Sequence, residues 1–328
     1  MPISRDSPRT LVVARMYYLE DRTQAEIAHH LGVSPPTVSR LLQRARAEGI
    51  VEIRIVDPSE VASDLGAVVA EATGARRVVV VPGHVDDPVV RRQRLGTAAA
   101  RLVEETVRDG DKIGIGWGRT LHSVAESLRH LDWAGRVTCA PLLGGLGKIA
   151  PAFQVHDITS AVARALGGSA LPLYLPAIVE DDDVRQQLLQ SPDAALVLSE
   201  WAYLTTALVG IGHVGFDAEM QMLFGRYLDA STQDRLRRSG AVGDICMRFY
   251  DRDGHPIDDG LRGVIGLDLE RLRRIPNVIA VAGGSEKSEA IIGALRGGYV
   301  DTLVTDEPTA QAIVAALERA TPTRGPAR

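Results

Sequence analysis

Apolar and polar positions alternate with helical period through residues 9–20 and again through residues 24–42. The first stretch predicts one helix, and the second predicts two short helices separated by a turn at Gly32. The apolar stripe of the first helix is expected to hold Val12, Met16 and Leu19, flanked by Leu11 and Tyr18. The helix pair is expected to pack through Ile27, Ala28, Leu31, Val38, Leu41 and Leu42. This is the pattern of a helix-turn-helix supported by a preceding helix.

The second helix of the pair keeps its polar side chains on the outer face. Ser34 can cap this helix through its side-chain oxygen, and Pro35 fits the first turn, where no N–H is needed. Hydroxyl, amide and guanidinium groups hydrogen-bond base edges and phosphates, so this face predicts a helix that reads DNA. The predicted DNA-contacting residues are Gln24, Ser34, Thr37, Ser39, Arg40 and Arg44. The alternative is an αα-hairpin without a DNA-binding role, but packing residues, turn and polar face occur here together.

A domain boundary is expected near Asp57. The reading helix should continue to Gly49, and residues 50–55 alternate as a short strand, which predicts a wing. The Asp-Pro-Ser sequence at residues 57–59 ends that strand, and residues 60–73 are expected to form a connecting helix. The predicted domains are a winged helix-turn-helix at 1–57, a large domain for effector binding and oligomerisation at 58–320, and a frayed tail at 321–328.

From Arg76 onward, β-rich apolar runs alternate with alanine-rich helical runs, which predicts an α/β domain built on a doubly wound, mainly parallel sheet. Strands are expected at 78–81, 112–116, 137–143, 171–175, 207–211, 245–250, 278–282 and 302–305. Helices are expected at 89–108, 119–130, 156–166 and 308–318.

The charge balance bears on how DNA is bound. The formal net charge is −5, but residues 1–57 contain eight of the 37 basic and seven of the 42 acidic residues. The head therefore has a net charge of about +1, and the acidic surplus lies in the body. A head with so little charge releases few counterions from DNA, so we expect a homodimer or homotetramer that engages paired half-sites of a double-stranded operator.

Cysteine content and hydropathy bear on location. The two cysteines, Cys139 and Cys246, lack metal-ligand spacing and are expected to be buried thiols in a reducing cytosol. The N-terminus lacks an apolar signal region, and no run approaches the roughly 18 apolar residues that span a bilayer. The sequence therefore predicts a cytoplasmic protein with no membrane partner.

Glycine-rich junctions between strands and helices are the expected binding site, because open α/β sheets bind ligands beyond the carboxyl ends of their strands. Residues 114–120 include Gly116, Gly118, Arg119 and Thr120, where backbone N–H groups could hold a phosphate. This is not the dinucleotide fingerprint, because Arg119 stands where its third glycine should be. The alternative is a tight glycine turn without a ligand.

Further junctions add polar candidates. Lys287 follows the glycines of residues 282–287 and could offer its charge to an anion, or it could simply be solvated. Gln154 follows the glycine-rich residues 141–148 and could reach the same site, whereas Lys148 and His156 are interpreted as surface or helix-start residues. Asp244 is the best candidate for a carboxylate that accepts hydrogen bonds from sugar hydroxyls. Its alternative role is to cap a turn.

No catalytic constellation accompanies these loops. The chain has no Gly-x-Ser-x-Gly elbow, no His-Glu-x-x-His motif and no paired cysteines, so we expect neither catalytic residues nor a metal or other cofactor.

Motifs along nearly the whole chain resemble one family. In the head they are Thr-Gln-Ala-Glu-Ile-Ala at 23–28, Leu-Gly-Val-Ser at 31–34, Val-Ser-Arg-Leu-Leu at 38–42 and Gly-Ile-Val at 49–51. In the body they are Gly-Trp-Gly-Arg-Thr at 116–120, Leu-Gly-Gly-Leu-Gly at 143–147, Ala-Leu-Val-Gly-Ile-Gly at 207–212, Gly-Asp at 243–244, Gly-Gly with Lys at 283–287, and Leu-Val-Thr-Asp-Glu at 303–307. The chain resembles the SorC-type sugar-responsive bacterial transcriptional regulators.

The resemblance implies a body of the sugar-phosphate isomerase and glucosamine-6-phosphate deaminase type that retains the pocket as a sensor. It implies that Gly118 and Thr120 hold an effector's phosphate, that Gln154 and Asp244 meet its hydroxyls, and that Lys287 completes the anion site. Some relatives carry a basic residue directly before the Gly-Gly at 144–145, where it contacts phosphate or forms an imine. Leu143 stands there instead, which argues against covalent capture and makes an unphosphorylated polyol a credible ligand.

The function expected from these observations is a transcriptional regulator whose operator binding is controlled by a sugar, sugar phosphate or polyol. The competing hypothesis is a sugar-phosphate isomerase or deaminase that carries a DNA-binding head. An architectural DNA-bending protein fits poorly with the acidic body and its glycine-rich junctions.

Overall fold

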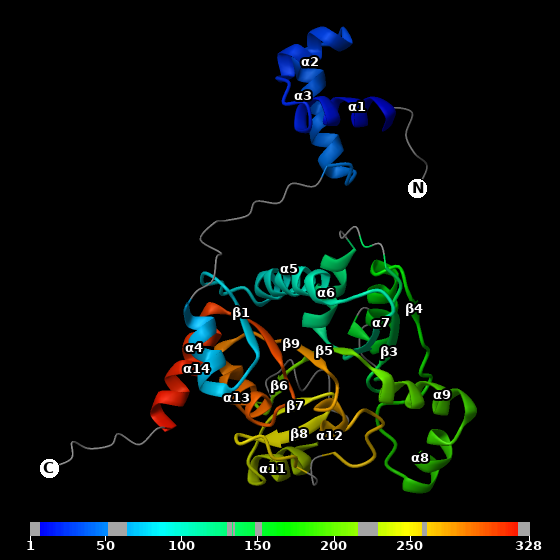
Figure 1. Cartoon of the computed structure of the whole chain (residues 1–328), viewed down its shortest axis with the longest axis vertical. Coiled ribbons are helices and arrows are strands. Elements are labelled where there is room, and N and C mark those ends of the chain that lie inside the picture. Colours follow the sequence, from blue (N-terminus) through cyan, green and yellow to red (C-terminus); the bar gives the residue numbers. More distant parts are fainter. Residues whose placement is uncertain are drawn as a thin grey trace, which may run out of the picture. The chain divides into compact units, whose positions relative to one another are not determined.

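The computed structural model describes residues 7–51, 64–129, 133, 135–147, 153–215, 229–257 and 261–320. The chain divides into two compact units, Met1–Pro58 and Ser59–Arg328, which are here called the head and the body (Figure 1). The boundary predicted near Asp57, most of the predicted wing at 50–55 and the predicted tail at 321–328 lie outside the described residues.

The head is a three-helix unit made of α1 (Ser7–Tyr18), α2 (Gln24–Leu31) and α3 (Pro35–Ala47). Its core consists of Val13, Met16, Ile27, Ala28, Val38 and Leu42. The helix-turn-helix prediction is confirmed, but the predicted stripe of α1 is wrong in part. Val12 and Leu19 are 45% and 74% exposed, whereas Val13 is fully buried. Leu11, Val12 and Val13 are consecutive apolar residues, so periodicity alone could not fix which of them faces the other helices.

The turn between α2 and α3 forms at Gly32, whose φ of +62° places it in the left-handed region. Ser34 occupies the N-cap position of α3, but its hydroxyl lies 2.9 Å from the Thr37 hydroxyl and makes no capping bond to a backbone N–H. The predicted side-chain cap is therefore wrong. A complete capping box, which the sequence analysis missed, starts α2: Thr23 Oγ1 accepts from the Glu26 N–H, and Glu26 Oε2 accepts from the Thr23 N–H.

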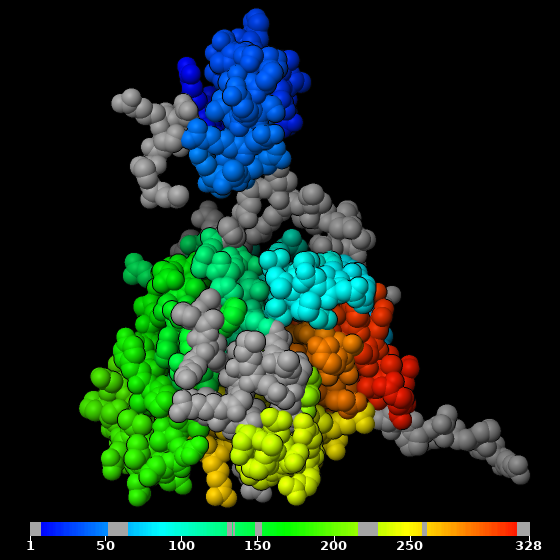
Figure 2. All heavy atoms as spheres, turned by 180° about the vertical axis from the view of Figure 1, so that it is seen from behind, coloured from blue at the N-terminus to red at the C-terminus, as the bar shows by residue number. Residues whose placement is uncertain are grey.

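The body contains a seven-stranded sheet with the strand order β1-β10-β9-β5-β2-β3-β4, in which every neighbouring pair is parallel. Its strands are β1 (Arg77–Val81), β2 (Lys112–Ile115), β3 (Thr138–Pro141), β4 (Ser169–Ala170), β5 (Thr206–Gly210), β9 (Asn277–Val281) and β10 (Thr302–Asp306). Figure 2 shows the cyan surface from the start of the body beside the orange and red surfaces of its C-terminal part, in agreement with the pairing of β1 with β10.

Helices cover both faces of this sheet (Figure 1). One face packs on α5 (Pro88–Thr106), α6 (Arg119–Leu128) and α7 (Val155–Ala165), and the other on α4 (Asp64–Thr73), α13 (Ser288–Arg296) and α14 (Glu307–Ala320). Side chains alternate between the two cores, as Ile279 and Ala280 of β9 do. The other helices within the described parts of the body are α8 (Asp182–Leu189), α9 (Pro192–Glu200), η3 (Trp201–Tyr203), α11 (Ala230–Arg238), α12 (Leu269–Leu272) and η4 (Ser285–Lys287). The predicted α/β class with a parallel sheet is confirmed.

Two predicted strands are wrong. Only Ser169 and Ala170 form strand β4 beside β3. The Leu171 N–H still donates to the Cys139 carbonyl oxygen at 2.8 Å, but residues 172–175 leave the sheet, and the leucines of this segment pack against a core instead. Residues 245–250 are not one strand, because a turn at Cys246 and Met247 separates β7 (Ala241–Ile245) from β8 (Arg248–Asp251). Both turn residues have positive φ, 52° and 64°, which is the geometry of a tight hairpin turn. With β6 (Gly212–His213), these strands form a small antiparallel sheet.

Two further features concern chemistry and location. Cys139 and Cys246 are both buried and free of disulfides, and burial raises the pKa of each thiol to about 12. None of the helices in the described ranges combines the length and apolar character needed to cross a bilayer.

Candidate functional site

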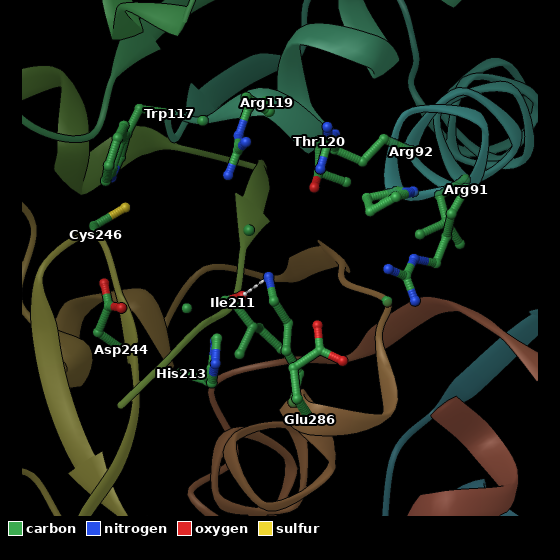
Figure 3. Close-up of a pocket in the computed structure, with 17 residues that line it drawn as sticks. Arg91, Arg92, Trp117, Arg119, Thr120, Ile211, His213, Asp244, Cys246 and Glu286 are labelled. Carbon is green, nitrogen blue, oxygen red and sulfur yellow. Dashed lines mark hydrogen bonds between the residues drawn. The ribbon is translucent and has the colours of Figure 1, made fainter. Parts of the chain in front are cut away.

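A cavity of about 290 Å³ opens beyond the carboxyl ends of β2, β5 and β9 (Figure 3). From β2 the chain continues outward to β3, whereas from β5 it continues in the opposite direction to β9. The cavity therefore lies at the switch point where doubly wound sheets bind ligands. Its walls are Pro88, Arg91, Arg92, Leu95, Trp117, Gly118, Arg119, Thr120, Gly210, Ile211, Gly212, His213, Asp244, Cys246, Gly283, Glu286 and Lys287.

The junction after β2 forms one wall of the cavity. Gly118 is the N-cap of α6 and has a φ of +110°, a conformation that favours glycine. Arg119 and Thr120 follow as the first residues of α6, so the first N–H groups of this helix, which lack partners within it, adjoin the cavity. Gly116 does not line the cavity. A side chain there would press on Leu121 and on the Leu208 carbonyl, so Gly116 lets the junction approach β5 closely.

The junction after β9 places Lys287 at the cavity. The Gly284 N–H donates to Asp306 Oδ2 at 3.0 Å and to Thr309 Oγ1 at 2.7 Å, which fixes the glycine turn before η4. The Lys287 ammonium then donates to the Ile211 carbonyl oxygen at 2.8 Å (Figure 3). Burial lowers the pKa of Lys287, and the nearby carboxylates of Glu286 and Asp244 oppose that shift.

Asp244 lies near the end of β7 and is only 5% exposed. Its Oδ2 accepts a hydrogen bond of 3.0 Å from the Met247 N–H, so it does cap the hairpin turn, and the same carboxylate also lines the cavity. Burial raises the pKa of Asp244 to about 6, although the Met247 N–H and Lys287 favour the charged form. Gly212 pairs with Asp244 across the small sheet, and a side chain at position 212 would collide with the carboxylate.

The structure brings together most, but not all, of the predicted effector residues. Gly118, Arg119, Thr120, Asp244 and Lys287 share the cavity. Gln154, like Gly116, is not among the lining residues.

Gln154 holds a neighbouring loop. It is the N-cap residue of α7, its Oε1 accepts from the Leu146 N–H at 3.1 Å, and its amide nitrogen donates to the Leu146 carbonyl. Leu143 is fully buried in a core, and Lys148 lies outside the described residues. The effector-binding roles of Gly116 and Gln154 remain predictions.

Several lining residues were missed by the sequence analysis: Arg91, Arg92, Trp117, His213 and Glu286. The two arginines lie inside a long helix, where charged residues usually face solvent. Their position in the sequence therefore did not indicate that they line a cavity. Glu286 and His213 adjoin predicted elements and could have been found from those junctions. Within the described part of the chain, no group of three or more His, Cys, Asp or Glu side chains is arranged to hold a metal ion.

The polar face of α3 is the candidate DNA interface. Arg40 is exposed on this helix, and Thr37 and Ser39 are partly exposed. Arg44 forms an ion pair with Glu48, its Nε lying 2.6 Å from Glu48 Oε1. Gln24 begins α2. The buried face of α3, with Val38 and Leu42, holds the helix against the head so that the opposite face remains available to a groove.

A helix-turn-helix joined to a switch-point α/β domain defines the class of ligand-responsive transcriptional regulators. Two family models agree with this division. Residues 57–315 match the Sugar-bind family, described as "Putative sugar-binding domain", and residues 12–48 match sigma-70 region 4.

Relatives extend the match to nearly the whole chain. The sorbitol operon regulator of Klebsiella pneumoniae is 32% identical over 317 residues, which cover 94% of this chain and 98% of that protein. The deoxyribonucleoside regulator of Bacillus subtilis (strain 168) is 33% identical over 306 residues, covering 93% and 96%. The crystal structure of full-length SorC from Klebsiella pneumoniae aligns with a TM-score of 0.79 and 32% identity, covering 95% of this chain and all of that one.

The chain belongs to the SorC family of sugar-binding transcriptional regulators. It is a DNA-binding regulator of carbohydrate metabolism in which a sugar-binding body controls the operator binding of a helix-turn-helix head.

Proposed function

We propose that the cavity beyond β2, β5 and β9 is the effector site of this regulator, and that it binds a sugar, sugar phosphate or polyol. The observation that carries the proposal is the combination of groups in one cavity of about 290 Å³: a glycine-capped helix start, a buried carboxylate and a partly buried ammonium. Backbone N–H groups suit phosphate oxygens, and a carboxylate accepts hydrogen bonds from sugar hydroxyls. The volume is of the order expected for a small-molecule site.

The residues have distinct proposed roles. Gly118, Arg119 and Thr120 hold the phosphate or the corresponding end of a polyol. Asp244 accepts hydrogen bonds from hydroxyls, and its Oδ2 is already oriented by the Met247 N–H. Lys287 adds positive charge between these two groups. Gln154 acts from outside the cavity by holding the loop at Leu146.

We propose that the head reads operator DNA through Gln24, Ser34, Thr37, Ser39, Arg40 and Arg44. The protein acts in the cytoplasm as a homodimer or homotetramer, because one weakly charged head supplies few phosphate contacts. Effector binding shifts populations between forms that differ in operator affinity, by as much as the effector's differential affinity allows.

The protein is proposed to sense its ligand without transforming it and without a cofactor. Its relatives are named as regulators, and its cavity holds a lysine engaged with a backbone carbonyl. The competing function is an isomerase or deaminase, for which His213 and Asp244 are the titratable groups at hand. Incubation with aldose and amino-sugar phosphates, followed by chromatography of the products, separates the two. Turnover that disappears in Asp244→Asn would establish the enzyme instead.

A ligand screen coupled to DNA binding tests the proposal. The full-length protein is first screened by thermal shift against sugars, polyols and their phosphates. Each compound that stabilises the protein is then added to the protein bound to a labelled DNA fragment selected from genomic DNA. We expect at least one compound to stabilise the protein and to change its DNA affinity. A protein that prefers no DNA fragment, or whose preference ignores every stabilising compound, would contradict the proposal.

A further inference from the structure

Helix α5 presents two arginines to the cavity. Pro88, Arg91, Arg92 and Leu95 line it with the spacing i, i+3, i+4 and i+7, which is one face of the first two turns of a helix. Leu95 is 1% exposed and anchors this face in the core. The Asp87 carboxylate caps the helix start by accepting from the Val89 N–H at 2.7 Å, so the turn that carries the arginines is well defined.

The same part of the molecule brings α5 close to α6. A Cβ atom at Gly96 would lie 2.5 Å from the Ser123 carbonyl oxygen, so the two helices cross at a distance that only glycine permits. One turn before this crossing lies Arg92, and one turn before Ser123 lies Arg119. In Figure 3, Arg91, Arg92 and Thr120 occupy one side of the cavity, whereas Asp244 and Cys246 lie on the other. The cavity therefore has a basic end and an acidic end.

The charges of the lining leave a positive excess. Four basic side chains, Arg91, Arg92, Arg119 and Lys287, face the cavity together with two carboxylates, Asp244 and Glu286. No carboxylate in the described ranges lies within ion-pair distance of the Arg91 guanidinium. Burial lowers the pKa of Arg92, and the neighbouring charge of Arg91 lowers it further. An anion between these groups would relieve both effects.

We propose that Arg91 and Arg92 of α5 determine effector specificity: they bind the anionic end of the effector together with the start of α6, and so select phosphate esters over unphosphorylated sugars and polyols. The inference rests on the proposed effector site and adds the orientation of the effector within the cavity. The anionic end lies between α5 and α6, and the hydroxyls extend toward Asp244. Arginine suits this role because its planar guanidinium can donate two parallel hydrogen bonds to a phosphate.

Glu286 provides a test in which the expected change in phosphate-ester affinity is an increase rather than a loss. Its carboxylate folds back over Gly284 and lies in Figure 3 on the same side of the cavity as Arg91. A carboxylate at the basic end repels an incoming phosphate. Removing its charge in Glu286→Gln should therefore strengthen the binding of phosphate esters and leave the binding of neutral polyols nearly unchanged.

The experiment compares matched ligand pairs. Inorganic phosphate, glucitol 6-phosphate, ribose 5-phosphate and the unphosphorylated glucitol and ribose are titrated into full-length protein by calorimetry. The variants are Arg91→Gln combined with Arg92→Gln, Arg91→Gln alone, the Glu286→Gln variant described above, and Arg164→Gln, which removes an exposed arginine of α7 away from the cavity. For the phosphate ester that wild type binds best, we expect the double variant to lose about tenfold or more in affinity, or roughly 1.4 kcal/mol. Arg164→Gln should bind every compound as wild type does.

The outcomes separate this inference from the proposed function. A wild-type protein that prefers the unphosphorylated compounds, or a double variant that binds phosphate esters as tightly as wild type does, overturns the role of the arginines while leaving an effector site in place. If the double variant does not fold, as judged by circular dichroism, Arg91→Gln alone decides by the same criterion. A wild-type protein that binds none of the compounds overturns this inference, whereas the broader ligand screen above decides the proposed function.

Discussion

The ammonium of Lys287 lies 2.8 Å from the backbone carbonyl oxygen of Ile211 and donates a hydrogen bond to it. This bond joins the helical turn after β9 to the residue that follows β5, so two adjacent strand ends are connected directly at the cavity. Burial lowers the pKa of Lys287, and an anionic ligand beside it would favour the charged form. An anionic ligand beside Lys287 would therefore act on a side chain that is hydrogen-bonded to the residue after β5.

The first prediction is that Lys287→Met weakens both effector binding and the body. The Ile211 carbonyl loses its donor, which should lower the free energy of unfolding by about 1–3 kcal/mol. Loss of the ammonium should lower the affinity for a phosphorylated effector by about tenfold or more. Urea unfolding and calorimetric titration measure the two effects. Lys112→Met is the matched control, because Lys112 pairs with Glu200 at the opposite end of β2 and does not line the cavity. Equal effector affinity in the two variants would contradict the prediction.

The second prediction concerns the pH dependence that Asp244 adds to stability. Its carboxyl has a pKa raised from 3.8 to about 6, so between these values the folded body holds a proton that the unfolded chain releases. Raising the pH through this interval therefore destabilises the fold, by roughly 1.4 kcal/mol per pH unit. Above the pKa that Asp244 has in the folded body, the loss in free energy of unfolding no longer changes with pH. The titratable neighbours Cys246 and Tyr250 stay neutral over this range because their pKa values are raised.

The measurement compares wild type with Asp244→Asn, whose amide oxygen can still accept the Met247 N–H. Urea unfolding is followed from pH 4.5 to pH 7.5 by tryptophan fluorescence, which reports on the body because all three tryptophans lie there. The stability of the Asn variant relative to wild type should rise between about pH 4 and pH 6 and then become constant. Parallel stability curves across the whole range would show that the carboxyl titrates normally.

The sequence predicted those parts of the molecule in which the order of apolar, polar and glycine residues is compatible with only one local structure. Helical spacing with a glycine turn defined the head, and strands followed by glycine junctions located the part of the cavity wall that holds Gly118, Arg119, Thr120 and Lys287. The β7–β8 hairpin could not be predicted, because its turn consists of Cys246 and Met247, which carry none of the usual turn chemistry although both adopt positive φ. Arg91 and Arg92 could not be found either, because only the close crossing at Gly96 shows which face of α5 meets the cavity.

The third prediction is that Gly118→Ala strains the start of α6. Gly118 has a φ of +110°, and nothing lies within 4 Å of a Cβ atom placed there, so the cost comes from the backbone alone. We expect about 1 kcal/mol or more of lost stability, together with weaker binding of phosphorylated effectors because the first N–H groups of the helix shift. Gly147→Ala is the control, since a Cβ atom there also meets open space and its φ is ordinary. The prediction fails if the two variants are equally stable and bind effector equally well.

The fourth prediction is that Arg40→Ala impairs DNA reading in a sequence-dependent way. Arg40 is exposed on α3, on the face opposite the buried Val38 and Leu42, and an arginine in this position can donate two hydrogen bonds to a guanine edge. If it reads a base, its loss should cost about 1–3 kcal/mol of operator affinity and relax preference at one base pair. Fluorescence anisotropy against operator fragments with single substitutions measures both. Arg15→Ala removes the same charge from α1 and should keep the base preference. Unchanged discrimination in Arg40→Ala would remove this residue from the reading face and assign base contact to Thr37, Ser39 or Arg44.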